Sequence, residues 1–285
     1  MLEMLINPKK AERKPWELFF VGLLYASLSI LLVHWIFGQD PVLSEASGIL
    51  VVTFTVMFSL PFIFYTLKYE EKKAEEETSG LSLLKEHKRA IMVFLWLFLG
   101  FLVAYAFWNM ILTTPTFNFQ IKTYCQINQP GSFESCVQQY GLNTQNALTG
   151  NATSGERFLS IFTNNIYVLI FTLIFSLIFG AGAIFILAWN ASVIAAAIGI
   201  FTKSDLTLLP LGLARYMIHG LPEIAAYFIV ALAGGLVSVA VIKHEFGTPM
   251  FWDVLQDSLN LIILSVVVLL IAGLIEVFIT PVLFN

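Results

Sequence analysis

The stretch FLSIFTNNIYVLIFTLIFSLIFGAGAIFILAWNASVIAAAIGI, residues 158–200, decides the fold class because it contains no Asp, Glu, Lys or Arg. A helix needs about 20 mostly apolar residues to cross a bilayer, so this tract is long enough to cross twice and must fold back once. Gly180-Ala181-Gly182 and Trp189-Asn190 are the two alternative breaks. We expect the turn to lie within 180–190, which makes the tract two spans.

The composition of the whole chain agrees with a membrane protein. Only 12% of the 285 residues are charged and the mean hydropathy is +0.82, whereas a soluble domain carries about 25% charged residues. These values exclude a soluble enzyme, a disordered tail and a nucleic-acid-binding protein, and the continuous apolar runs do not suit an outer-membrane barrel. We therefore expect an all-α, polytopic bundle of about seven spans in the lipid bilayer, at residues 16–37, 48–67, 90–112, 158–179, 184–201, 221–242 and 258–280.

The distribution of Lys and Arg predicts the orientation, because cytoplasmic segments near helix ends are enriched in these residues. Residues 1–15 hold four of them and residues 68–89 hold six, whereas 38–47 hold none and 113–157 hold two. We expect the N-terminus inside and the C-terminus outside, in the cell membrane. The domains are then 1–89, a two-helix N-terminal extension with a charged cytoplasmic loop, and 90–285, a five-helix core with the external loop 113–157.

The external loop contains both cysteines, Cys125 and Cys136. Cysteines confined to one external segment favour a disulfide over two free thiols, and such a bond would stabilise by about 3 kcal/mol in the chain-entropy model. Asn151 begins an Asn-Ala-Thr glycosylation sequon in the same loop. We expect this loop to be the surface for any protein partner.

The segment before the last span reads as a separate helix. Thr248-Pro249 is typical of an N-cap followed by Pro at the first helical position. Apolar and polar side chains then fall on different faces of residues 250–257. The pattern predicts a short amphipathic helix at the inner interface.

Ionisable groups inside spans are costly and usually functional or paired. The parity of the spans places several polar residues near the outer leaflet, where we expect a vestibule for an ion or small ligand. They are Asn109, Asn164, Asn165, His219, Glu223 and Glu276, with Arg215 nearby.

The two glutamates differ in how easily a structural role explains them. Pro222 predicts a first helical turn, and there Glu223 would face the positive end of the helix dipole. Glu276 lies about 6 Å below the end of its span, and we expect a partner for it, Arg215 first and His219 second. His219, Glu223 and Glu276 are only weak metal candidates, because a metal site needs three or four ligands; we expect no metal and no cofactor.

Small residues four apart predict close helix packing in the second half of the chain, where they also offer faces for a homo-oligomer. The first three spans are bulkier. The pairs are Ser176/Gly180, Ala195/Gly199, Ala231/Gly235 and Gly234/Ser238.

The order of motifs in the second half resembles a known family. Asn164-Asn165 opens a span, His219-Gly220-Leu221-Pro222-Glu223 follows, and Glu276-Val277-Phe278-Ile279-Thr280-Pro281 closes the chain. This order resembles the stage II sporulation protein M-like integral membrane protein family, mainly over 158–285. The resemblance implies a prokaryotic source and a five-helix core with its N-terminus inside and its C-terminus outside. Similar proteins occur in prokaryotes that do not sporulate, so it implies no sporulation role, and it implies no firm role for the His and Glu residues.

Three functions fit these observations. The first is movement or binding of an ion or small solute through the polar vestibule. Against it, no polar residues mark the part of a pathway that would cross the inner half of the membrane. The alternative is a non-enzymatic scaffold that binds partners. The third, an intramembrane metal-dependent hydrolase, needs a third ligand and a base. No catalytic motif is present, so we expect that the protein is not an enzyme.

Overall fold

The computed structural model describes residues 13–38, 40, 43–74, 82–112, 115–128, 133–139, 154–179, 183–202, 205–242 and 247–284. Within these residues every regular element is a helix, which confirms the all-α class. The elements are α2 (Glu17–Phe37), α3 (Ser47–Ala74), α4 (Ser82–Ile111), η2 (Pro115–Phe117), α5 (Asn118–Asn128), α6 (Phe133–Gln139), α7 (Ser154–Phe179), α8 (Ala183–Thr202), η4 (Leu206–Leu208), α9 (Leu209–Ile242), α10 (Pro249–Leu274), η5 (Ile275–Ile279) and α11 (Thr280–Leu283).

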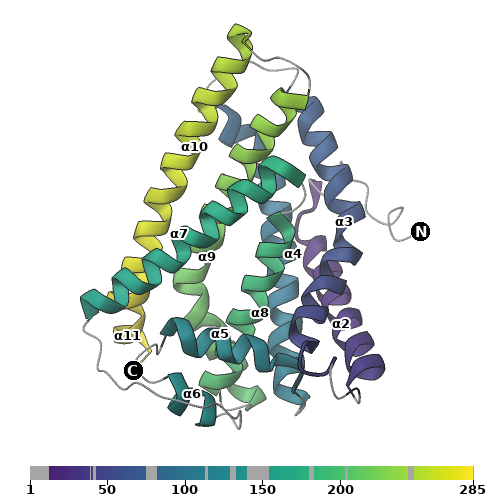
Figure 1. Cartoon of the computed structure of the whole chain (residues 1–285), viewed down its shortest axis with the longest axis vertical. Helices are drawn as coiled ribbons and strands as arrows, with labels where there is room; N and C mark the ends of the chain where they lie inside the picture. The colour runs from purple at the N-terminus through teal and green to yellow at the C-terminus, as the bar shows by residue number, and fades with distance from the viewer. Residues whose placement is uncertain are drawn as a thin grey trace.

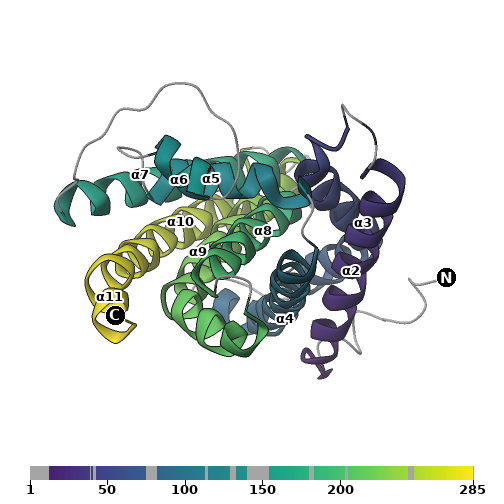
Figure 2. The same cartoon turned by 90° about the horizontal axis from the view of Figure 1, so that it is seen from below.

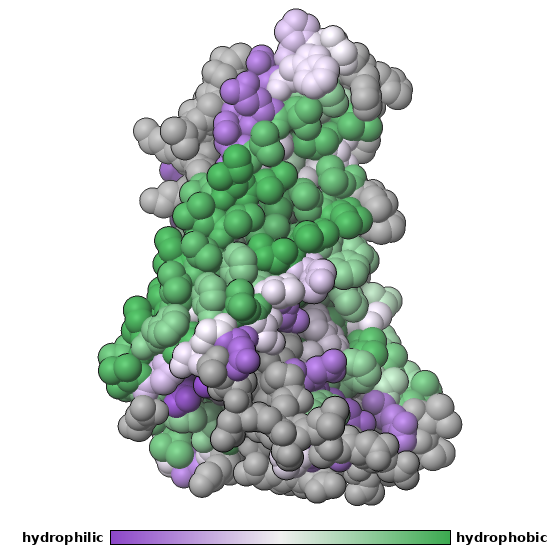
Figure 3. Space-filling model, turned by 60° about the vertical axis from the view of Figure 1, so that its left-hand side comes forward, coloured by the Kyte–Doolittle hydropathy of each residue, from purple (hydrophilic) through white to green (hydrophobic). Residues whose placement is uncertain are grey.

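Six stretches of helix among the described residues are long and apolar enough to cross a membrane. Large apolar side chains are exposed along α7 and α10, and Figure 3 shows a continuous hydrophobic band across this face with polar patches above and below it. The chain is therefore a multi-pass membrane protein. The described apolar part of α3, Ser47–Ile63, is shorter than a full span, so the count of seven spans stays a prediction.

The helices form two groups joined by α8 (Figure 1). α2, α3 and α4 pack together on one side, α9 and α10 form an antiparallel pair on the other, and α8 packs against both α4 and α9. α7 crosses α9 and α10 obliquely. Helices α5 and α6 lie at the lower end of the bundle in Figure 1, where the C-terminus also lies, and the view from below shows them along the side of α7 (Figure 2); we call this the α5–α6 end.

The long apolar tract breaks between Phe179 and Ala183, within the expected range. α7 ends at Phe179 and α8 begins at Ala183, while 180–182 lie outside the described residues. Trp189-Asn190, the alternative break, lies inside α8, where Asn190 Nδ2 donates to the carbonyl of Ile186 at 2.8 Å. That bond satisfies the amide within its own helix, so Asn190 does not interrupt it.

The prediction that a helix begins at Pro222 is wrong, because α9 starts at Leu209 and continues through Pro222. Asp205 instead caps the short helix η4 that leads into α9. Its carboxylate accepts hydrogen bonds from the hydroxyl (2.8 Å) and the backbone N–H (2.9 Å) of Thr207. These two donors lower the pKa of Asp205. Glu223 therefore lies in a helix interior, and the dipole of a helix start does not explain it.

The separate amphipathic helix is also a wrong prediction. Thr248 does cap a helix, accepting from the N–H of Phe251 at 3.2 Å, and Pro249 occupies its first position. That helix is α10, which runs without a break to Leu274. Residues 250–257 are therefore the first turns of a long helix.

Glycines bring α2 and α4 into backbone contact. A Cβ on Gly22 would overlap the carbonyl oxygen of Leu97, and one on Gly100 would overlap that of Phe19. Close packing is therefore present in the first half of the chain too, although the first three spans were expected to be bulkier. Gly22/Ala26 and Gly100/Ala104 are both pairs of small residues four apart, so the sequence carried the signal for this contact as well.

We expect Gly22→Ala to lower the thermal unfolding midpoint in detergent. Its methyl group would meet a backbone carbonyl, which cannot rotate away like a side chain, and such overpacking costs about 1–3 kcal/mol. Gly155→Ala is the matched control, because nothing lies within 4 Å of its added Cβ. Equal midpoints for the two variants would contradict the close approach of α2 and α4.

Candidate functional site

Four side chains form a polar row along one face of α9. Tyr216, His219, Glu223 and Tyr227 are spaced by three, four and four residues, which places them on one face of a helix. The ring of Tyr216 meets that of His219 edge-on, with centroids 6.1 Å apart, and the hydroxyl of Tyr227 donates to Glu223 Oε1 at 2.8 Å. This α9 polar row covers about 16 Å of helix, roughly half of a hydrocarbon core of about 30 Å.

The end of α10 and the two short elements after it face this row. His219 Nδ1 lies 3.2 Å from Thr280 Oγ1, and the carboxyl groups of Glu223 and Glu276 interact electrostatically. His219 and Glu223 are four residues apart on α9. Their partners Thr280 and Glu276 are also four residues apart, in the reverse chain order. The antiparallel pair thus carries two polar rungs, one histidine–threonine and one glutamate–glutamate.

Both helices depart from regular α-helix beside these rungs. Glu276 lies in the π-helical turn η5, where the hydroxyl and the backbone N–H of Thr280 both donate to the carbonyl of Ile275. Pro281 follows and has no N–H to donate to the carbonyls one turn earlier. Pro222 likewise leaves the carbonyl of Ile218 without its regular helical donor. Backbone carbonyls therefore become available next to both carboxyl groups, and π-turns occur frequently at functional sites.

The hydrogen bonds of Thr280 assign the proton on His219. The Thr280 hydroxyl donates to Ile275 at 3.1 Å, so it can only accept from the imidazole. His219 then carries its proton on Nδ1 and leaves Nε2 as a free acceptor. The ring is thereby oriented for proton exchange at Nε2.

Arg215, the expected partner of Glu276, binds elsewhere. Its Nη1 donates to the carbonyl of Phe284 at 2.8 Å, and its guanidinium lies 4.6 Å above the ring of Phe201. The cation whose charge acts on Glu276 is Arg157, an exposed residue of α7 that the sequence pattern did not single out. In the part of the chain that the structure describes, the one ion pair within 4 Å joins Lys14 and Glu17, so neither Glu223 nor Glu276 is paired.

The three asparagines lie in two separate places. α7 crosses α10 where Phe158 meets Gly273, and it crosses α9 where the Ser176 hydroxyl donates to the carbonyl of Ala231. Asn164 and Asn165 lie between these crossings, joined by a 3.3 Å bond, and Asn165 is buried. They are therefore over the α9–α10 pair.

Asn109 lies apart from this cluster, at the contact of α4 with α8. Its Nδ2 donates to the carbonyl of Ala195 at 3.4 Å, and a Cβ on Gly199 would come within 2.5 Å of the same atom. The small pair Ala195/Gly199 admits this side chain to the backbone of α8. A homo-oligomer through the small-residue faces stays a prediction.

The segment that carries the two cysteines packs against the bundle through α5. Gln120 is completely buried, and its Nε2 donates to the carbonyl of Gly48 in α3 (2.9 Å) and to the hydroxyl of Ser192 in α8 (3.2 Å). One turn later, the hydroxyl of Tyr124 is hydrogen bonded to Tyr216, the first member of the α9 polar row. α5 thus contacts the polar row directly.

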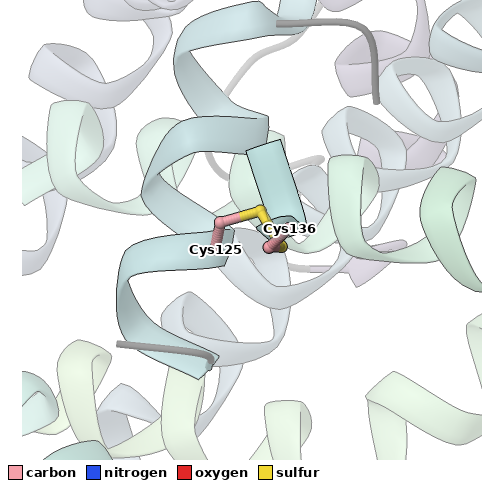
Figure 4. The surroundings of a disulfide bond; sticks show 2 residues. All are labelled: Cys125 and Cys136. Carbon is pink, nitrogen blue, oxygen red and sulfur yellow. A yellow bond between two sulfur atoms is a disulfide. The ribbon is translucent and has the colours of Figure 1, made fainter. Parts of the chain in front are cut away.

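Cys125 and Cys136 form the expected disulfide, which joins α5 to α6 with their Cα atoms 5.8 Å apart (Figure 4). Both cysteines are buried with Val137 in a small apolar cluster of their own. The bond therefore fixes the residue next to Tyr124. Asn151, the glycosylation candidate, lies outside the described residues.

Buried hydroxyl groups occupy the other half of the same helices, where no polar pathway was expected. Ser265 donates to its own helix and Ser176 to α9, whereas the Oγ of Ser258 has no partner among the described residues. A search for charged residues misses these groups because hydroxyls are common in apolar helices. The buried hydroxyl residues of α7 and α10 are Thr172, Ser176, Ser258 and Ser265.

The weak metal candidates do not assemble into a ligand set. Among the described residues, no group of three or more His, Cys, Asp or Glu side chains is arranged to hold a metal ion. The structure adds hydroxyl groups around His219, Glu223 and Glu276 that the sequence did not single out. They belong to Tyr124, Tyr216, Tyr227 and Thr280.

Comparisons with known proteins identify a family whose matched region contains His219, Glu223 and Glu276. A family model described as stage II sporulation protein M matches residues 90–281, which include α7, α9 and nearly all of the last helix. An uncharacterized protein of Methanocaldococcus jannaschii is 34% identical over 129 residues, which cover 44% of this chain and 71% of the relative. No solved structure matches the chain. The match covers well over half of the residues, so the chain belongs to the stage II sporulation protein M family.

Proposed function

We propose that this membrane protein is not an enzyme but binds a small cation at Glu223 and Glu276 and moves it across the cell membrane. The observation that carries the proposal is the coupling of two unpaired carboxyl groups on adjacent apolar helices. A carboxylate inside a membrane is costly unless a proton or another cation neutralises it. Two together therefore form a site that attracts positive charge.

The shape of the backbone supports a transport role. In many transporters, interrupted helices leave carbonyl groups that bind ions near a central site. Here Pro222 and the π-turn at Ile275–Ile279 interrupt the hydrogen-bond ladders beside the two carboxyl groups. The buried hydroxyls of α7 and α10 supply polar groups in the other half of the bundle.

The proposed orientation puts the α5–α6 end outside the cell. Lys and Arg are concentrated in residues 1–15 and 68–89, as expected for cytoplasmic segments. The Cys125–Cys136 bond supports the same orientation, since disulfides persist in oxidising compartments. Glu223 and Glu276 would then lie in the outer half of the membrane.

The test is cation flux through purified protein in liposomes, measured separately for protons, Na⁺ and K⁺. We expect Glu223→Gln and Glu276→Gln each to reduce the flux by at least about tenfold, because glutamine keeps the size of the side chain but removes its charge. Glu45→Gln, at an exposed glutamate outside the cluster, should leave the flux unchanged. Wild-type flux in both variants would disprove the site.

The alternative role is a membrane scaffold that binds partners through the external loop. The observation favouring it is that α5 and α6 form a folded, disulfide-closed unit at one end of the bundle. If the wild-type protein passes none of the three cations, transport is excluded and this role becomes the leading one.

A further inference from the structure

We infer that the cation is the proton, and that it passes between the external surface and the carboxyl pair along side chains of α5 and α9. This inference rests on the proposed function and names its substrate. The route begins at Tyr124 on α5, continues through Tyr216 and His219, and reaches Glu276 and Glu223.

The first support is the proximity of groups that can exchange protons. The hydroxyls of Tyr124 and Tyr216 are hydrogen bonded, the ring of Tyr216 contacts His219, and His219 bonds Thr280, one turn from Glu276. At the far end the Tyr227 hydroxyl donates to Glu223. These contacts connect three elements, α5, α9 and the π-turn, without the use of a charged side chain as a link.

The second support is the chemistry of the carboxyl pair. Two neighbouring carboxyl groups do not both ionise readily, so a pair of them is suited to sharing one proton. A metal cation would need several oxygen ligands around it, but one oxygen of Glu223 already accepts the bond from Tyr227. A proton needs no such shell.

The third support is the state of His219. With its proton on Nδ1 bonded to Thr280, the imidazole can accept a proton on Nε2. For the Nδ1 proton to leave toward Glu276, the Thr280 hydroxyl must turn from the Ile275 carbonyl, give its own hydrogen to the carboxylate and take the Nδ1 proton in exchange, so that one proton enters as one leaves. The groups that face it are Arg215, Tyr216 and Glu223 on α9, Glu276 and Thr280 on the facing helix, and Arg157 of α7 and Tyr124 of α5 around the cluster. The positive charge of Arg215 acts on His219 from the same helix.

The test uses the full-length protein in liposomes with a trapped pH-sensitive dye and an imposed membrane potential, in parallel with isotope flux of Na⁺ and K⁺. We expect proton flux that Glu276→Gln abolishes and that His219→Gln and Tyr216→Phe each reduce by at least about tenfold. His219→Gln keeps a donor for Thr280 but cannot titrate, so it should also flatten the pH dependence of the flux. Tyr167→Phe, at an exposed tyrosine on α7, is the control and should behave as the wild type. Thermal unfolding of each variant checks that it is folded.

The outcomes separate this inference from the proposed function. Glutamate-dependent Na⁺ or K⁺ flux without proton flux would overturn the proton as substrate and leave the cation site standing. Glutamate-dependent proton flux that neither His219→Gln nor Tyr216→Phe changes would overturn the route. No glutamate-dependent flux of any cation would remove both proposals.

Discussion

Replacing Glu276 by lysine should abolish cation flux and still leave the protein folded. The lysine would place a fixed positive charge beside Glu223, with which Glu276 interacts in the native protein. An ion pair inside the bundle would replace two carboxyl groups that compete for one proton, so the site would be neutral without a bound cation. We expect flux at the background of empty liposomes and a thermal midpoint close to that of the wild type.

Two further variants show that the partner of the new lysine is Glu223. Leu270→Lys puts the same side chain on the lipid-facing side of α10, where the native residue is 40% exposed. An unpaired lysine in a membrane helix costs about 3 kcal/mol, so this variant should unfold earlier. The double variant Glu223→Gln with Glu276→Lys should also lose stability relative to Glu276→Lys alone. If the double variant is as stable as the single one, the two side chains are not neighbours.

The sequence predicts a common depth for the polar residues, which stays a prediction, but it does not predict which of them meet. Counting spans places Asn109, His219 and Glu276 near the same leaflet because each lies at a known end of an apolar run. That argument contains no information on the side of a helix that a residue occupies. The structure separates them: His219 on α9 faces Thr280, one turn from Glu276, whereas Asn109 faces α8.

The polar row was missed because a rule from soluble proteins was applied to a membrane helix. Pro222 was expected to start a helix, and so Tyr216 and His219 were expected to precede it. In a membrane, proline is tolerated inside a helix because other groups satisfy the freed carbonyl. The regular spacing from Tyr216 to Tyr227 on both sides of Pro222 is the signal that could have shown one continuous helix. Tyr124 had no such signal, since only tertiary packing brings α5 to α9.

Removing the disulfide should loosen the α5–α6 unit without unfolding the helix bundle. α5 and α6 are too short to be stable by themselves, and their shared cluster of Cys125, Cys136 and Val137 is separate from the main core. Replacing both cysteines by serine should cost the unit about 3 kcal/mol, which is about a hundredfold in its opening equilibrium. Hydrogen exchange of the α5 and α6 amides should accelerate by that factor, while α8 amides exchange as before.

The same variant links the fold of the external loop to the proposed proton route. Tyr124 precedes Cys125, so an opened unit withdraws the hydroxyl that meets Tyr216. Gln120 still ties the start of α5 to α3 and α8, so the loss should be partial, and proton flux should fall less than in Tyr216→Phe. Adding a membrane-impermeant reductant to oriented liposomes should produce the same decrease in the wild type and none in the serine variant. A reductant effect of equal size in both would mean that the bond has no part in it. An unchanged exchange rate of α5 in the serine variant would show that packing alone holds the unit closed.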